Sequence, residues 1–175
     1  FHKKRIEECL RKNIQINERE AQIEAEYILR FALKKPSSFF ISNQKFKIDK
    51  IQEEFISSIL KKRIKREPLA YIFNEWDFYG ETFYLDKNSL IPRQDTELII
   101  DLVIKKYDKE SKLNRSHLRT GSGVIGITVS KLYPNSIITI SDISSKALNV
   151  ANKNIKNHNV TNMRSLESDW FDNFK

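Results

Sequence analysis

The chain has 175 residues, of which 31 are Lys or Arg and 23 are Asp or Glu, so its formal net charge is +8. Hydrophobic residues make up 39% and aromatic residues 11%, which is enough apolar material to bury a core and excludes a wholly disordered chain. No run approaches the roughly 18 apolar residues that a membrane span requires, and no segment near Phe1 resembles a signal peptide. We therefore expect a soluble protein of one ordinary domain or two small ones.

Cys9 is the single cysteine, so this chain can form neither an internal disulfide nor a thiolate metal site. A reducing cytoplasm is therefore the expected location, and no metal is expected. Cys9 has helical spacing with Ile6 and Leu10, which favours a core position over a role as a nucleophile.

Charge and glycine are both distributed unevenly along the chain. Residues 1–73 carry 17 Lys or Arg and 10 Asp or Glu, whereas residues 74–175 carry 14 and 13. Three of the four glycines, Gly121, Gly123 and Gly126, fall within six residues. A chain with so little glycine is expected to place these three where the backbone requires them.

Residues 1–73 are predicted to form a helical domain. Asn17 with Glu20, and later Asp49 with Gln52, are typical pairs at the start of a helix. Apolar residues then recur at helical spacing in both segments: Ile23, Tyr27, Ile28 and Phe31 in the first, and Phe55, Ile56, Ile59, Leu60 and Ile64 in the second. Pro36 and Pro68 are expected at or just beyond the ends of these helices.

Residues 74–94 are predicted to form a β-hairpin linker. Trp76, Phe78, Phe83 and Leu85 alternate with other residues on either side of Gly80, as in two short strands. A helix capped by Asp95 or Thr96 should follow, with its inward side formed by Leu98, Ile99, Leu102 and Val103.

Residues 95–175 alternate between helix and strand signals after Ser116. A turn at 120–123 opens a helix to Tyr133, residues 136–140 form a β-branched run, Ser144 caps a second helix, and residues 162–168 can form another strand. Alternation of this kind predicts an α/β fold with a parallel sheet and right-handed crossovers.

Residues 121–126 fit the pattern Gly-x-Gly-x-x-Gly at a predicted turn from strand to helix. Asp142 lies 19 residues after Gly123, at the end of the next predicted strand. Glycines let a ligand approach the backbone, the helix N-terminus offers free N–H groups, and an acid at that place binds ribose hydroxyls. The pattern indicates a ligand containing adenosine, and it leaves a tight structural turn and a dinucleotide-binding oxidoreductase as alternatives.

Three further segments decide against the oxidoreductase. Glu67-Pro-Leu-Ala-Tyr71, Leu90-Ile-Pro-Arg-Gln-Asp-Thr-Glu97 and Ser168-Asp-Trp-Phe171 have an order and spacing that resembles the release factor glutamine methyltransferase family. The resemblance runs from about Glu18 to Phe171. It implies a helical bundle that docks the release factor, a β-hairpin linker, and a Rossmann-like class I methyltransferase domain whose sheet is incomplete in this chain.

The resemblance also implies a binding site for the methyl donor S-adenosyl-L-methionine. It places residues 120–123, which are Thr120, Gly121, Ser122 and Gly123, under the methionine part of the donor. Asp142 would bind the ribose hydroxyls, and Asp169 and Trp170 would line the adenine pocket.

The sequence departs from the family pattern in two places. His117 stands where the family has an acid, and Arg119 stands where it has its first glycine, so a bulky side chain is expected near the donor. The family's Asn-Pro-Pro-Tyr motif, which would carry the chemistry, does not occur before Lys175. We therefore predict the N-terminal part of a longer enzyme and name no catalytic residue.

The basic residues of 61–66 are predicted either to form a solvated helix face or to dock an acidic partner. The resemblance favours peptide chain release factors as that partner of a monomeric enzyme. Two alternatives stay open: an adenine-amino methyltransferase acting on DNA or RNA, and a non-catalytic binding module whose donor site is disabled. No nucleic-acid recognition motif accompanies the basic residues.

Overall fold

The structure, a computed structural model, describes residues 2–43 and 46–174. The chain divides into two compact units, residues 1–73 and 74–175. Residues 1, 44, 45 and 175 fall within the expected domains 1–73 and 95–175 but lie outside the described residues.

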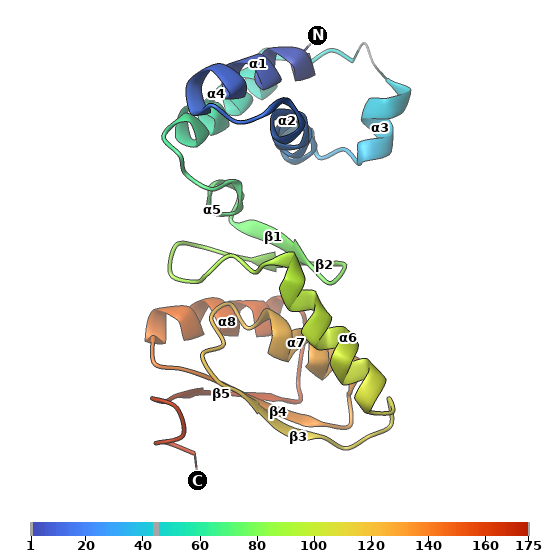
Figure 1. The fold of residues 1–175 in the computed structure, drawn as a ribbon, viewed down its shortest axis with the longest axis vertical. Helices are drawn as coiled ribbons and strands as arrows, with labels where there is room; N and C mark the ends of the chain where they lie inside the picture. Colours follow the sequence, from blue (N-terminus) through green and yellow to red (C-terminus); the bar gives the residue numbers. More distant parts are fainter. Residues whose placement is uncertain (1, 44–45, 175) are drawn as a thin grey trace. The chain divides into compact units, whose positions relative to one another are not determined.

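The first unit is helical (Figure 1). Its described helices are α1 (His2–Ile14), α2 (Glu18–Leu33), α3 (Ser37–Ser42), α4 (Lys50–Ile64) and α5 (Leu69–Phe73). Nine buried aliphatic side chains from α1, α2 and α4 form its core: Ile6, Leu10, Ile14, Ala21, Ala25, Ile28, Leu29, Ile56 and Ile59. The helices of this unit are therefore held together by apolar packing.

Both predicted helix starts are confirmed. The Asn17 side chain accepts a hydrogen bond from the backbone N–H of Glu20 at 2.8 Å, and Asp49 does the same for Gln52. Each pair is a complete capping box, because Glu20 and Gln52 reach back to the cap residue's own N–H. Free N–H groups at the first turn are satisfied in this way without tertiary contacts.

The predicted inward face of α2 is partly wrong. Ile23 and Tyr27 are exposed, and the buried residues of this helix include Ala21 and Ala25. Small side chains let the neighbouring helices approach closely, so they occupy the contact in place of the larger ones. Cys9, expected in the core, is half-buried.

The second unit combines a hairpin, a parallel sheet and three α-helices. The hairpin consists of β1 (Glu75–Phe78) and β2 (Glu81–Tyr84), paired antiparallel as predicted. After a 3-10 turn (Gln94–Thr96) come α6 (Glu97–Lys106), β3 (Asn114–His117), α7 (Val124–Leu132), β4 (Ile137–Asp142), α8 (Ser145–Asn157) and β5 (Met163–Glu167). The α/β class predicted for this part of the chain is confirmed.

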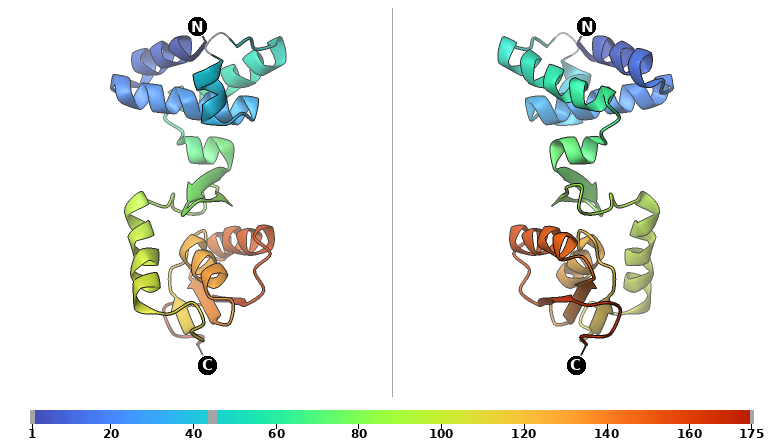
Figure 2. Two further views of the ribbon diagram at one scale, coloured as in Figure 1. Left: turned by 90° about the vertical axis from the view of Figure 1, so that its right-hand side faces the viewer. Right: turned by 90° about the vertical axis from the view of Figure 1, so that its left-hand side faces the viewer.

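The sheet has the order β3-β4-β5, with both strand pairs parallel. Because the order is sequential and the crossovers are right-handed, α7 and α8 cover the same face of the sheet, as Figures 1 and 2 show. Side chains from the hairpin, α7 and β4 meet in one buried core, among them Phe78, Phe83, Ile127 and Ile140. The hairpin is thereby part of the second unit.

The prediction for α6 is only partly confirmed. Ile100 is its buried residue, whereas Leu98 and Leu102 are 61% and 65% exposed. Thr96 occupies the N-cap position, but its side chain makes no capping hydrogen bond, and Asp95 lies inside the 3-10 turn. The 3-10 turn leads directly into the helix, and Ile100 with Val103 forms the side that packs on the core.

None of the helices within residues 2–43 and 46–174 is long and apolar enough to cross a membrane.

Candidate functional site

The glycine turn lies between β3 and α7, where the carboxyl ends of the parallel strands meet. Gly121 and Gly123 have positive φ angles of 56° and 82°, a left-handed conformation that glycine adopts without a steric penalty. The Thr120 N–H donates to the Ser141 carbonyl at 2.9 Å, which fixes the loop to β4. Two of the three clustered glycines thus have the backbone conformation that requires glycine, as expected.

Asp142, the last residue of β4, is bonded directly to this turn. One carboxylate oxygen accepts the Gly121 N–H at 2.9 Å, and the other accepts the Ser144 N–H at 3.0 Å. A carboxylate oxygen can accept more than one hydrogen bond, so both oxygens keep acceptor capacity for ligand hydroxyls. The glycine loop and the acid predicted from the sequence therefore form one site.

The space around the glycines differs from one to the next. A Cβ at Gly121 would meet no heavy atom within 4 Å, so the loop faces open space there. A Cβ at Gly123 would lie 3.1 Å from the Ala151 side chain, and one at Gly126 would lie 2.5 Å from Cγ2 of Ile140. Gly121 thus permits a ligand, whereas Gly126 permits α7 to pack on the sheet.

Asp169 and Trp170 follow β5 and both side chains are exposed, Trp170 by 58%. Because β5 is parallel to β4, these residues lie beyond the same sheet edge as Asp142. Trp170 has a positive φ of 46°. The guanidinium of Arg119, which also has a positive φ, lies 6.0 Å from the centre of the indole ring. The residue that departs from the family pattern therefore contacts the residue expected to bind adenine.

His117 at the end of β3 supports the turn. Its Nδ1 and the Thr120 hydroxyl oxygen are 3.0 Å apart and share a hydrogen bond. Burial lowers the pKa of His117, and the nearby Asp142 carboxylate opposes that shift. His117 therefore favours its neutral form and helps hold Thr120, which is a structural role in this loop.

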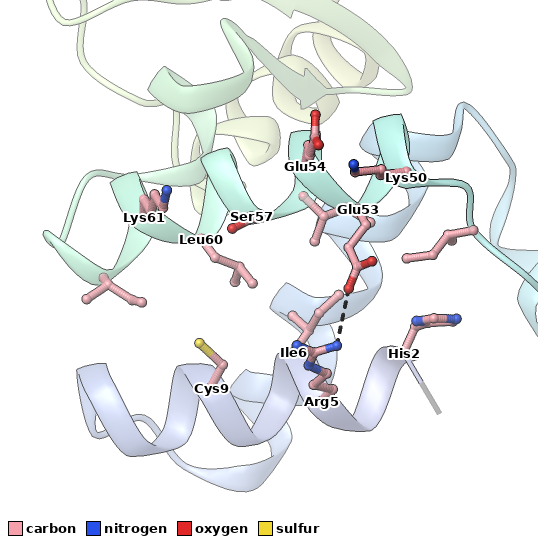
Figure 3. A pocket seen from close by; sticks show the side chains of 13 residues that line it. His2, Arg5, Ile6, Cys9, Lys50, Glu53, Glu54, Ser57, Leu60 and Lys61 are labelled. Carbon is pink, nitrogen blue, oxygen red and sulfur yellow. Dashed lines mark hydrogen bonds and ion pairs between the residues drawn. The ribbon is translucent and has the colours of Figure 1, made fainter.

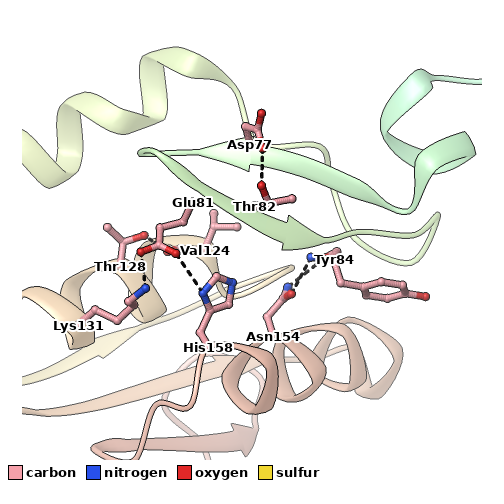
Figure 4. Close-up of polar contacts among 9 residues, drawn as sticks. All are labelled: Asp77, Glu81, Thr82, Tyr84, Val124, Thr128, Lys131, Asn154 and His158. Atoms are coloured by element: carbon pink, nitrogen blue, oxygen red, sulfur yellow. Dashed lines mark hydrogen bonds and ion pairs between the residues drawn. The ribbon is translucent and has the colours of Figure 1, made fainter. Parts of the chain in front are cut away.

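Sequence reasoning missed Asn154, which lies fully buried on α8 (Figure 4). Its side-chain amide hydrogen-bonds the backbone of Tyr84 in the hairpin and the carbonyl of Ser122 in the glycine loop. The available signal was an asparagine three residues after Ala151, at helical spacing with the buried face of α8.

Polar contacts also attach the hairpin to the helices of its unit (Figure 4). Glu81 forms an ion pair with Lys131 of α7, and its carboxylate also lies 3.6 Å from Nδ1 of His158, which follows α8. The His158 ring stacks on Phe83, with 4.4 Å between ring centres. Burial, together with the charge of Lys131, lowers the pKa of His158 in spite of Glu81.

The helical unit contains a separate hollow of about 510 Å³ between α1 and α4 (Figure 3). Ile6, Cys9 and Leu60 belong to its lining, and an ion pair between Arg5 and Glu53 crosses it at 3.2 Å. Its lining mixes apolar side chains with charges of both signs, so it has no specific chemistry of the kind present at the glycine loop.

Two family models match the chain. Residues 4–73 match the model described as the PrmC N-terminal domain, and residues 96–175 match the methyltransferase small domain. The loop, the acid and the parallel sheet all lie within the second match. Fold and site together define the class of protein, a methyltransferase domain preceded by a helical domain.

Curated relatives agree with both matches. The chain is 37% identical over 160 residues to the release factor glutamine methyltransferase of Mycoplasma mycoides, with 91% of this chain and 55% of that protein covered. It is 30% identical over 149 residues to the protein of the same name from Coxiella burnetii, with 85% and 54% covered. It is also 32% identical over 179 residues to a bifunctional methyltransferase of Rickettsia bellii, with 87% and 32% covered.

The chain is thus similar to the release factor glutamine methyltransferases along most of its length, as the resemblance predicted, and it spans about half or less of the length of these relatives. Among solved structures, coclaurine N-methyltransferase bound to N-methylheliamine and SAH aligns with 82% of this chain and 48% of its own. The TM-score of this match is 0.42 and the sequence identity is 16%.

Proposed function

We propose that the intact protein transfers a methyl group from S-adenosyl-L-methionine to the side-chain amide of the glutamine in the Gly-Gly-Gln motif of peptide chain release factors. The observation that carries this proposal is the joined site of glycine loop and Asp142, with its bond from the Gly121 N–H to the carboxylate. It occurs in a chain with two matched domains of this family.

The residues at the loop fit the donor. Open space beside Gly121 lets a ligand approach the backbone, and Asp142 retains acceptors for ribose hydroxyls. The first turn of α7 offers N–H groups to the methionyl carboxylate, which the helix dipole also favours. Asp169 and Trp170 would border the adenine, because an indole provides a flat apolar surface for a purine.

The bound donor would supply an electrophilic methyl group on a sulfonium. In the transfer the carbon–sulfur bond breaks, a carbon–nitrogen bond forms, and the amide nitrogen loses one proton. An amide nitrogen is a poor nucleophile, so the protein's contribution is mostly to hold donor and amide in line. In this proposal the described residues would hold the donor, and we assign no catalytic residue among them.

The basic helical unit is the proposed docking part for the release factor. Lys61, Lys62, Lys65 and Arg66 are exposed at the end of α4, whereas Arg63 is bound to Glu24 through two hydrogen bonds of 2.8 Å. Four exposed charges at one helix end would steer an acidic protein surface toward this unit. A nucleic acid is the alternative partner for the same charges.

Labelled S-adenosyl-L-methionine tests the reaction. Incubated with the intact protein and a release factor, it should label the glutamine of Gly-Gly-Gln, and a release factor with that glutamine replaced by alanine should stay unlabelled. Methylation of DNA or RNA in a competition assay would instead favour the adenine-amino methyltransferase. Absence of transfer to any of these substrates would contradict the proposal.

The contact of Arg119 with Trp170 favours one further candidate, a non-catalytic module with a disabled donor site. Calorimetry with S-adenosylhomocysteine separates the two. Micromolar binding by the intact protein would exclude a disabled site, whereas binding of NAD in its place would indicate the dinucleotide function.

A further inference from the structure

We propose that Asn154 is a positioning residue that sets the conformation of the donor loop and fixes that loop to the hairpin. This inference rests on the proposed function, because it assigns a role at the same donor site. It comes from the hydrogen bonds of a single buried amide (Figure 4).

Asn154 makes three hydrogen bonds to two segments that are distant in sequence. Its Oδ1 accepts the Tyr84 N–H at 2.8 Å, and its Nδ2 donates to the Tyr84 carbonyl at 3.0 Å and to the Ser122 carbonyl at 2.9 Å. Both amide hydrogens are thereby used, and the side chain has no exposure to solvent. A buried amide whose donors are both paired holds its partners in one orientation.

The backbone N–H and C=O of Tyr84 find no hydrogen-bond partner within the hairpin itself. Leu85 donates its N–H to the Asn74 carbonyl, so the neighbouring residue Tyr84 directs its own backbone groups away from the partner strand. The Asn154 amide pairs with both of these groups, in the manner of a peptide group from an adjacent strand. At this edge of the hairpin the Asn154 side chain therefore makes the two hydrogen bonds that a third strand would make.

The contact with the loop is at Ser122, between the two glycines with positive φ. Glycine on both sides leaves the Ser122 peptide group conformationally free, and the hydrogen bond to Asn154 removes that freedom. Ala151, one helical turn earlier on α8, lies against Gly123. The loop is thus bonded to Asp142 on one side and to Asn154 on the other.

Two substitutions in the intact protein test this role. Asn154→Asp is isosteric but sets a carboxylate against two backbone carbonyls, and Asn154→Ala removes the amide altogether. Asn152→Ala, on the exposed side of the same helix, is the matched control. Binding of S-adenosylhomocysteine is measured by calorimetry, KM is measured separately for the donor and for the release factor, and the urea midpoint reports stability.

We expect both Asn154 variants to raise the dissociation constant of S-adenosylhomocysteine and the KM of the donor at least tenfold. The KM of the release factor should stay within twofold, and Asn152→Ala should change neither. A lower urea midpoint with unchanged donor affinity would overturn the proposal, because a purely structural role moves stability alone. Complete loss of folding in both variants would overturn it as well.

Failure of the proposed function gives a different result. If the unsubstituted protein binds no S-adenosylhomocysteine, the proposed donor site is wrong, and the proposed role of Asn154 is wrong as well. If the unsubstituted protein binds and both variants bind equally well, only the role of Asn154 is wrong.

Discussion

The two units bury different kinds of side chain. Among the described residues the helical unit buries only apolar side chains, whereas the α/β unit buries nine polar ones. They are Ser89, Thr120, Ser122, Thr128, Ser130, Ser136, Ser141, Asn154 and Ser168. Helices satisfy their backbone groups internally and need only an apolar face. The loops at the two ends of the strands carry backbone groups that have no partner in the sheet, and side chains from neighbouring segments satisfy several of them.

Several polar side chains of the second unit hold the loops that connect its strands and helices. Ser136 accepts the Leu113 N–H at 2.8 Å and donates to the Ser111 carbonyl, which holds the segment leading into β3. Nδ2 of Asn162 lies within hydrogen-bond distance of three carbonyls, that of Ser130 in the last turn of α7 and those of Tyr133 and Ser136 after it. The same device, in Asn154 and Asp142, holds the candidate site.

Gly126→Ala should have the largest effect on stability, because the α/β unit tolerates no added atom where α7 meets the sheet. A Cβ there would lie 2.5 Å from Ile140, so we expect a loss of about 1–3 kcal/mol in the free energy of unfolding. Urea unfolding of the intact protein measures it. Gly80→Ala is the control for steric overlap, because a Cβ at Gly80 would meet no heavy atom within 4 Å. In that variant only the positive φ would lower stability. Equal losses in both variants would contradict the packing argument.

Glu24→Gln tests whether the helical unit depends on any polar contact. The two hydrogen bonds between Arg63 and Glu24 are 2.8 Å long, and the side chains are only 16% and 21% exposed. Loss of the charge should cost about 1–2 kcal/mol after allowance for solvent screening. Glu53→Gln, which breaks the exposed pair with Arg5, should cost less than about 0.5 kcal/mol. Similar values for the two variants would show that burial of the pair does not matter.

Arg119→Gly tests the side chain whose guanidinium lies over the Trp170 ring at the candidate site. Removal of the guanidinium frees the Trp170 face and relieves a left-handed residue, φ 54°. We expect binding of S-adenosylhomocysteine to tighten about tenfold, which corresponds to ~1.4 kcal/mol. Calorimetry on the intact protein measures the change, with Arg115→Gly, on the preceding strand, as the control. Weaker binding by Arg119→Gly would mean that the arginine helps to hold the donor.

The smallest expected effect is a pH dependence of stability that arises in the α/β unit. Burial lowers the pKa of His117 below its ordinary value of 6.5, so below that pH the unfolded state binds more protons than the folded state. The free energy of unfolding should therefore fall as the pH drops from about 7 toward 5. His117→Asn should flatten this dependence in part, since the pKa of His158 is also lowered. An unchanged pH profile in the variant would show that His117 does not contribute.

Much of the fold could be predicted because it depends on local signals. The capping boxes at Asn17 and Asp49, the hairpin around Gly80 and the alternation after Ser116 act within a few residues along the chain. The inward faces of α2 and α6 were predicted less well. Which stripe of an apolar helix is buried depends on the neighbour it meets, and in α2 alanines occupy the contact.

The candidate site also combines features that local sequence signals predict with features that depend on tertiary packing. By itself the sequence determined the glycine turn and the acid one strand later, since spacing along alternating strands and helices places them at one edge. Tertiary structure alone decided that Arg119 lies over Trp170, that His117 holds Thr120, and that the Asn154 amide joins hairpin to loop. Hydrogen bonds between segments 32 and 70 residues apart depend on the packing of α8, for which a single sequence has no local signal.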